Sequence, residues 1–135
     1  MAEGDALHGL TVLVVEDEIF IALELERILD TAGCHVLGPV ASVADALELL
    51  ENGKPGAALL DVQLLNGMIT PVAERLLALE IPFVLVSAYT GPELDKPVLA
   101  KAPRVDKPVS QPWLLGALTK AVRASNGLGM APDQL

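Results

Sequence analysis

The sequence predicts a doubly wound α/β domain, in which five parallel strands form one sheet with helices on both faces. Two observations lead to this prediction. Short apolar runs alternate with segments of helical spacing. The apolar runs lack a polar face, which is typical of strands buried on both sides in a parallel sheet. Right-handed crossovers leave few strand orders, and of these we expect 2-1-3-4-5.

The first half of the chain alternates two expected strands with two expected helices. Thr11–Val15 is a continuous β-branched and apolar run, whereas His35–Val40 is a weaker strand with an internal Gly-Pro pair. Ile19–Asp30 has apolar residues at helical spacing. A second helix runs from Ser42 to about Glu51, because Ser42-Val-Ala-Asp45 resembles a capping box.

The middle of the chain repeats the same alternation. Ala57–Leu60 is an all-apolar run that predicts the third strand. A loop containing Asn66-Gly67 follows. Pro71 suits the first turn of a helix that ends near Leu79. Pro82–Val86 then predicts the fourth strand.

The last third is less regular. Three prolines lie between Gly91 and Pro103, so any helix there must be short or irregular. Arg104–Asp106 predicts a short fifth strand, and Gln111–Arg123 predicts the last helix. We expect Trp113 to pack at the base of that helix.

The length of 135 residues fits one domain with a single core. We expect residues 1–8 to be a flexible leader, residues 9–124 to form the domain and residues 125–135 to be a flexible tail.

The composition excludes several classes of protein. A net charge of −9 disfavours direct nucleic-acid binding, because an acidic surface repels phosphates. One cysteine excludes an internal disulfide and a cysteine-based zinc site. No run approaches the roughly 20 apolar residues of a membrane span, and the N-terminus lacks a secretory signal. We therefore expect a cytoplasmic protein with no membrane contact.

Polar residues occupy the ends of four expected strands. Glu16 and Asp17 follow the first strand, Asp61 the third, Ser87 the fourth and Lys107 the fifth. In a doubly wound sheet these carboxyl ends converge where ligands bind. The sequence therefore predicts one polar mouth built from all five residues.

The charges in this mouth favour a magnesium site. Three neighbouring carboxylates repel one another, and Lys107 offsets only part of that repulsion. An all-oxygen ligand set suits Mg²⁺, which leaves room for a phosphoryl group. Asp61 would then be the nucleophile that forms an aspartyl-phosphate. Lys107 would neutralise charge, and the Ser87 hydroxyl would donate a hydrogen bond to the phosphoryl oxygens.

Taken singly, these residues have simpler interpretations. Glu16 and Asp17 would be solvated loop charges, and Asp61 would cap the following turn. Ser87 would be a loop hydroxyl and Lys107 a surface lysine. The combination of strand-end residues favours the site. Glu18, by contrast, is expected only to suit the dipole at the start of the first helix.

From about Leu10 to Arg123 the chain resembles the flavodoxin-like receiver domains of two-component response regulators. The resemblance rests on Val14-Val-Glu-Asp-Glu18, Leu59-Leu-Asp-Val62, Val86-Ser-Ala-Tyr89 and Asp106-Lys-Pro108.

The resemblance implies a role for each site residue. Asp61 matches the phosphoacceptor. Asp17 and Asp61 match direct Mg²⁺ ligands, and Glu16 one that acts through water. The backbone carbonyl of Gln63 matches a further ligand. Ser87 and Lys107 match the hydroxyl and the lysine that contact the phosphoryl group.

The chain also departs from the usual receiver pattern. Arg104 stands where the family usually has an aromatic switch residue, and the proline that usually follows the phosphoacceptor loop is absent. These features are similar to an atypical alphaproteobacterial subgroup that lacks the switch aromatic. That subgroup tends to carry Phe-Ala-Thr-Gly at the fourth strand, where this chain has Leu85-Val-Ser-Ala88.

The function implied is that of a stand-alone receiver in a phosphorelay. It would take a phosphoryl group from a histidine kinase or histidine phosphotransferase. Its output would be a protein contact or onward phosphotransfer. It would be no enzyme beyond assisting its own phosphorylation and dephosphorylation. Acidic charge favours a monomer, although family members often form homodimers through the last helices.

Other functions remain as alternatives. An unphosphorylated docking module with the same fold is the main one, since the switch aromatic is missing. An Asp-dependent phosphatase is disfavoured, because Gln63 stands where those enzymes carry a second Asp. A flavin-binding module is disfavoured because an acidic run replaces the phosphate loop.

Overall fold

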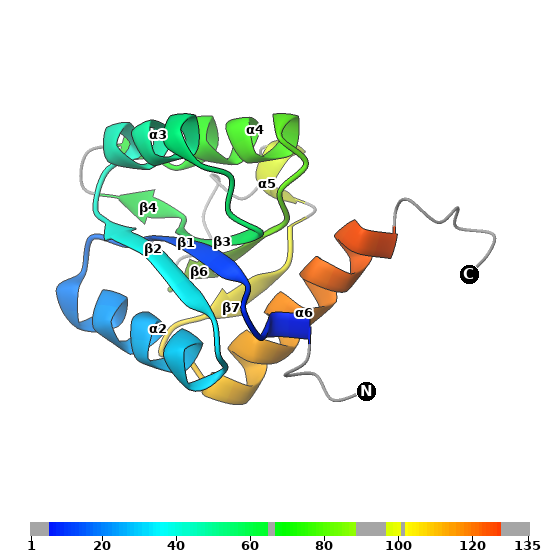
Figure 1. Cartoon of the computed structure of the whole chain (residues 1–135). Coiled ribbons are helices and arrows are strands. Elements are labelled where there is room, and N and C mark those ends of the chain that lie inside the picture. The colour runs from blue at the N-terminus through cyan, green and yellow to red at the C-terminus, as the bar shows by residue number, and fades with distance from the viewer. Residues whose placement is uncertain (1–5, 65–66, 89–96, 101, 128–135) are drawn as a thin grey trace.

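The structure is a computed structural model that describes residues 6–64, 67–88, 97–100 and 102–127. Five parallel strands form one sheet in the order β2-β1-β3-β6-β7 (Figure 1). When these five strands are numbered in chain order, their order in the sheet is 2-1-3-4-5. The predicted doubly wound sheet is therefore confirmed. The strands are β1 (Thr11–Val15), β2 (His35–Val40), β3 (Ala57–Asp61), β6 (Phe83–Ser87) and β7 (Arg104–Asp106).

Helices cover both faces of the sheet, as Figure 1 shows. α2 (Ile19–Thr31) and α6 (Gln111–Gly127) pack on one face. α3 (Val43–Asn52), α4 (Thr70–Ala78) and the short α5 (Pro97–Ala100) pack on the other. Both layers are needed because the sheet has no polar face to leave in water.

Alternate residues of each strand enter different cores. Leu13 and Val15 face the α3–α4–α5 layer, whereas Val12 and Val14 face the α2–α6 layer. Every residue of β3 and of β6 is buried. This double burial is the physical reason for the continuous apolar runs in the sequence.

Two predicted helix starts are confirmed. The Ser42 hydroxyl accepts a hydrogen bond from the Asp45 backbone N–H at 3.1 Å and so caps α3. Pro71 lies in the first turn of α4, where its missing N–H costs no helical hydrogen bond. α5 is only four residues long, in line with the irregular helix expected there.

A small hairpin, which the sequence did not predict, follows β3. β4 (Gln63–Leu64) pairs antiparallel with β5 (Gly67–Met68). Residues 65 and 66, including the expected Asn66 of the loop, lie outside the described residues, as do 89–96 and 101.

Both ends of the domain differ from expectation. Leu7 is buried in the α2–α6 core, and its carbonyl accepts a hydrogen bond from Cys34 Sγ at 3.4 Å, so packing begins inside the expected leader of residues 1–8. α6 continues to Gly127, which is into the expected tail of residues 125–135. The rest of the tail lies outside the described residues. The prediction for Trp113 was wrong, since it is 76% exposed at the start of α6.

Within these described ranges, no helix combines the length and apolar character needed to cross a membrane.

Candidate functional site

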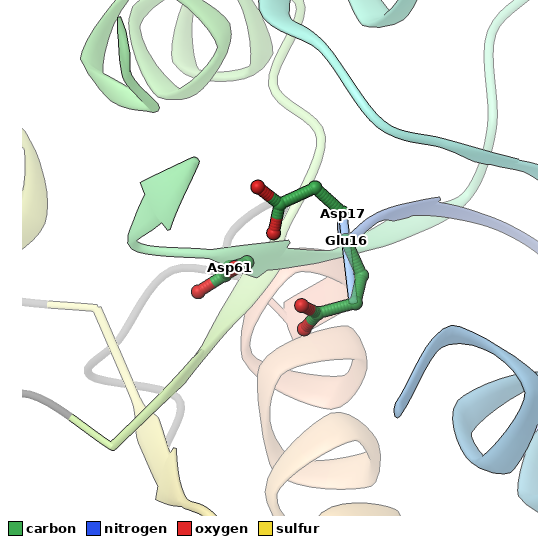
Figure 2. A group of neighbouring side chains, drawn as sticks. All are labelled: Glu16, Asp17 and Asp61. Atoms are coloured by element: carbon green, nitrogen blue, oxygen red, sulfur yellow. The ribbon is translucent and has the colours of Figure 1, made fainter. Parts of the chain in front are cut away.

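Three carboxylates meet at the carboxyl edge of the sheet. Glu16 and Asp17 directly follow β1, and Asp61 is the last residue of the neighbouring strand β3. Figure 2 shows the three side chains gathered at these strand ends. Each offers a carboxylate oxygen, and these oxygens all lie within 4.8 Å of one another. The predicted convergence of the acidic residues is therefore observed.

The backbone fixes the acidic residues tightly. The Glu16 N–H donates to the Val40 carbonyl at 2.9 Å, which ties the end of β1 to β2. Asp61 pairs in register with Val86 of β6. Only 2% of Glu16 and 5% of Asp61 are exposed, so water screens their charges little.

Lys107 brings one positive charge to the three carboxylates. Its backbone N–H donates to the Ser87 carbonyl at 3.1 Å, which anchors the turn after β7. Its Nζ lies 3.2 Å from Glu16 Oε1 and 3.5 Å from Asp61 Oδ1. The Lys107 side chain is only 10% exposed, so the predicted surface-lysine alternative does not describe it.

Burial and charge set the protonation of the site. Burial, and next the negative charge of Asp61, raise the pKa of Glu16 from 4.5 to about 7, although the Glu18 N–H and Lys107 act to lower it. Burial acts to lower the pKa of Lys107, but Asp61 and Glu16 outweigh it, so the pKa of Lys107 is raised. Lys107 is therefore protonated at neutral pH.

The donor set fits a divalent metal ion. One ammonium faces three carboxylates, which leaves negative charge uncompensated when all are ionised. Glu16 Oε1 is buried and accepts no hydrogen bond within the described residues, although it lies 3.2 Å from Lys107 Nζ. A hard cation with oxygen ligands would satisfy both needs. The fold thus carries an acidic cluster that suits a metal ion.

Two further predicted site residues lie close by in the chain trace. Ser87 ends β6, is 2% exposed and pairs in register with Asp106. Gln63 begins β4, two residues after Asp61, and its backbone pairs with Met68. Both positions adjoin the strand ends that carry Asp61 and Lys107.

Sequence reasoning missed one contact of the site. Glu18 was expected only to suit the helix dipole, but its Oε1 lies 3.1 Å from Lys107 Nζ. The two residues are 89 positions apart. No local pattern signals such a contact, because it depends on side-chain geometry across the edge of the sheet.

Arg104 occupies the position at which receivers usually carry the switch aromatic. Its Nε lies 3.3 Å from Asp106 Oδ1, and its side chain is about one-third exposed. It borders a cavity of about 280 Å³ together with Leu85 and Leu99. An arginine paired with Asp106 therefore occupies the position at which the family usually has an aromatic residue.

No family model matches the chain. Over 81 residues it is 32% identical to the phyllosphere-induced regulator PhyR of Methylorubrum extorquens, and this covers 58% of the chain. The match spans only 30% of that protein, and the chain spans 56% of the PhyR response regulator from Brucella abortus at a TM-score of 0.76, with 28% identity over 96% of the chain.

Smaller solved structures match over almost their whole length. The receiver domain of the Erythrobacter litoralis PhyR response regulator is 29% identical at a TM-score of 0.74, with 87% of the chain and 93% of that domain covered. SdrG from Sphingomonas melonis Fr1 is 36% identical at a TM-score of 0.72, with 91% of the chain and 99% of SdrG covered.

The fold, the strand-end motifs and these similarities define the class, and the chain belongs to the receiver domains of response regulators. Within that class it is similar to the receiver domain of PhyR, which is a regulator in alphaproteobacterial species. The predicted resemblance to receiver domains is confirmed.

Proposed function

We propose that this receiver accepts a phosphoryl group on Asp61 from a histidine kinase or a histidine phosphotransferase. One observation carries the proposal. Asp61 is a nearly buried carboxylate that lies within 4.8 Å of two other carboxylates and 3.5 Å from the Lys107 ammonium. A buried carboxylate beside a fixed cation is the arrangement that a carboxylate nucleophile for phosphorus needs.

The transfer moves one phosphoryl group between two nucleophiles. A carboxylate oxygen of Asp61 attacks the phosphorus, the new O–P bond forms, and the N–P bond to the donor imidazole breaks. The bonding electrons leave with the imidazole nitrogen. Lys107 stabilises negative charge on the transferring oxygens, and the Ser87 hydroxyl donates a hydrogen bond to one of them. Water removes the group by attacking the same phosphorus, which breaks the O–P bond to Asp61, restores the carboxylate and releases inorganic phosphate.

Mg²⁺ is the proposed cofactor. Asp17 and Asp61 would hold it directly, Glu16 through water, and Gln63 through its backbone carbonyl. The bound ion would neutralise carboxylate charge and orient the phosphoryl oxygens. Glu16 Oε1 supports this assignment, because it is buried and accepts no hydrogen bond within the described residues.

The proposed output is a protein contact or onward phosphotransfer. The receiver would assist only its own phosphorylation and dephosphorylation, and so would not turn over an external substrate. The acidic sequence, with a net charge of −9, supports a protein partner over a nucleic acid.

Intact mass measurement after incubation with acetyl phosphate tests the proposal. We expect the wild-type chain to gain one phosphoryl group with Mg²⁺ and none when the metal is chelated. Asp61→Asn should gain none, because an amide cannot act as the nucleophile. Asp106→Asn is the matched control, since it changes an exposed Asp at the end of another strand, and it should gain the group normally.

A gain that persists in Asp61→Asn would contradict the assignment of the acceptor. If acetyl phosphate and a purified histidine kinase both fail to phosphorylate the wild-type chain, the docking module without phosphorylation becomes the better account.

A further inference from the structure

The Lys107 ammonium is shared among three carboxylates. Its Nζ lies 3.1 Å from Glu18 Oε1, 3.2 Å from Glu16 Oε1 and 3.5 Å from Asp61 Oδ1. An ammonium has only three N–H donors. Two of them are used in hydrogen bonds, to Glu18 Oε1 at 3.1 Å and to Glu16 Oε2 at 3.3 Å. A phosphoryl oxygen on Asp61 therefore competes with these two carboxylates for Lys107.

The three partners differ in how readily they can leave. The Glu16 side chain is fully buried and that of Asp61 is 7% exposed, whereas the Glu18 side chain is 63% exposed. A buried carboxylate that loses its cation has no water to replace it, which is costly. Glu18 remains hydrated when it leaves, so the cost is small. Glu18 is thus the exchangeable partner of Lys107.

The side chain of Glu18 is not used to cap α2. Glu18 is the N-cap residue of α2, but its side chain makes no capping hydrogen bond. The backbone is held independently, because the Glu18 N–H donates to Glu16 Oε2 at 3.2 Å and its carbonyl accepts from Ala22 N–H at 2.9 Å. A neutral replacement at position 18 should therefore keep the fold.

We propose that Glu18 is a positioning residue that competes with the phosphorylated acceptor for Lys107. In the unmodified receiver it holds the ammonium toward the start of α2. When Asp61 carries a phosphoryl group, Lys107 leaves Glu18 and contacts that group. This inference rests on the proposed function of Asp61 and names a regulator of the same site.

Binding of beryllofluoride, which mimics a phosphoryl group on a carboxylate, tests the competition. In about 0.15 M salt with Mg²⁺, which screens distant charges, Glu18→Gln should bind beryllofluoride about 2- to 5-fold more tightly than wild type, the range set by a partly exposed ion pair. Glu26→Gln is the matched control, since it removes the same charge from the same helix without touching Lys107. Its affinity should stay within about 1.5-fold of wild type.

Lysine side-chain NMR gives a readout that does not depend on charge alone. Glu18→Gln should shift the Lys107 Cε and Nζ signals in the unliganded chain and leave them unshifted in the beryllofluoride complex. Equal affinity gains in Glu18→Gln and Glu26→Gln would overturn the proposal, as would equal Lys107 shifts in both states.

The two proposals fail in different ways. If wild type does not bind beryllofluoride in the presence of Mg²⁺, the proposed function fails, and the competition fails with it. If wild type binds but Glu18→Gln leaves the unliganded Lys107 signals unchanged, only the role of Glu18 is wrong.

Discussion

At the scale of single residues, Glu16 is where burial and charge conflict most strongly. It is 2% exposed, it neighbours Asp61, and its pKa is raised to about 7. Near neutral pH, Glu16 is therefore protonated in part of the metal-free molecules. A metal ion would have to displace that proton, which links metal binding to pH.

The raised pKa predicts how the stability of the metal-free chain changes with pH. Between pH 4.5 and about 7 the folded chain keeps a proton on Glu16 that the unfolded chain has lost. The free energy of unfolding should therefore fall as pH rises through this window. Glu16→Gln, which resembles the neutral acid, should remove this fall and stabilise the metal-free chain at pH 8 by about 1–3 kcal/mol.

Urea unfolding at pH 5 and pH 8 in a chelator measures this effect. Glu51→Gln on α3 is the control, because Glu51 is exposed, and it should unfold like wild type at both pH values. If Glu16→Gln and wild type lose stability equally on going to pH 8, the burial of an ionisable Glu16 is contradicted.

At the scale of elements, the strands and most helices could be predicted, because their signals are local. The all-apolar run Ala57–Leu60 marked β3, and Ser42 with Asp45 marked the start of α3. The β4–β5 hairpin could not be predicted, because each strand has only two residues and shows no periodicity. Trp113 was misplaced because a large apolar residue at a helix end does not reveal which face is covered.

The junction between β1 and β2 depends on a glycine. Gly38 has a φ of 101°, and a Cβ there would lie 2.9 Å from Val40 N and 3.0 Å from Val14 O. The β1–β2 register shifts at this point, just before Val40 accepts the hydrogen bond from Glu16. A side chain at position 38 would therefore disturb the backbone that places Glu16.

Two glycine substitutions should have opposite effects on stability. Gly38→Ala should cost about 1–3 kcal/mol, because it combines a left-handed φ with close backbone contacts. Gly116→Ala, in the middle of α6 where an added Cβ meets nothing within 4 Å, should stabilise the chain by about 0.5–1 kcal/mol. Thermal unfolding of both variants measures this, and a Gly38→Ala variant as stable as wild type would show that the junction tolerates a side chain.

At the scale of the whole molecule, the sheet order is what creates the site. β1, β3, β6 and β7 lie side by side and all run in the same direction. Strand-end residues as far apart in sequence as Glu16 and Lys107, which 91 positions separate, therefore meet at one edge. The meeting of strand ends could be predicted from topology. The sharing of Lys107 with Glu18 could not, because it depends on side-chain geometry across that edge.

Metal binding should stabilise the whole domain. If the acidic cluster binds Mg²⁺ in the folded chain alone, a tenfold excess over Kd should stabilise folding by about 1.4 kcal/mol. Asp17→Asn should weaken this response, whereas Asp30→Asn, an exposed residue at the far end of α2, should not. Thermal unfolding across a Mg²⁺ titration checks the prediction, and a midpoint that ignores Mg²⁺ in wild type would contradict a metal site.

The identity of the modified residue tests the central claim most directly. After phosphorylation with Mg²⁺, peptide mass spectrometry with borohydride reduction of the acyl phosphate should locate a single modification on Asp61. Treatment with hydroxylamine before the reduction should remove the phosphoryl group, as expected for a carboxyl phosphate. A phosphoryl group on Ser87, His8 or any other side chain, with Asp61 unmodified, would contradict the assignment of Asp61 as the phosphoacceptor.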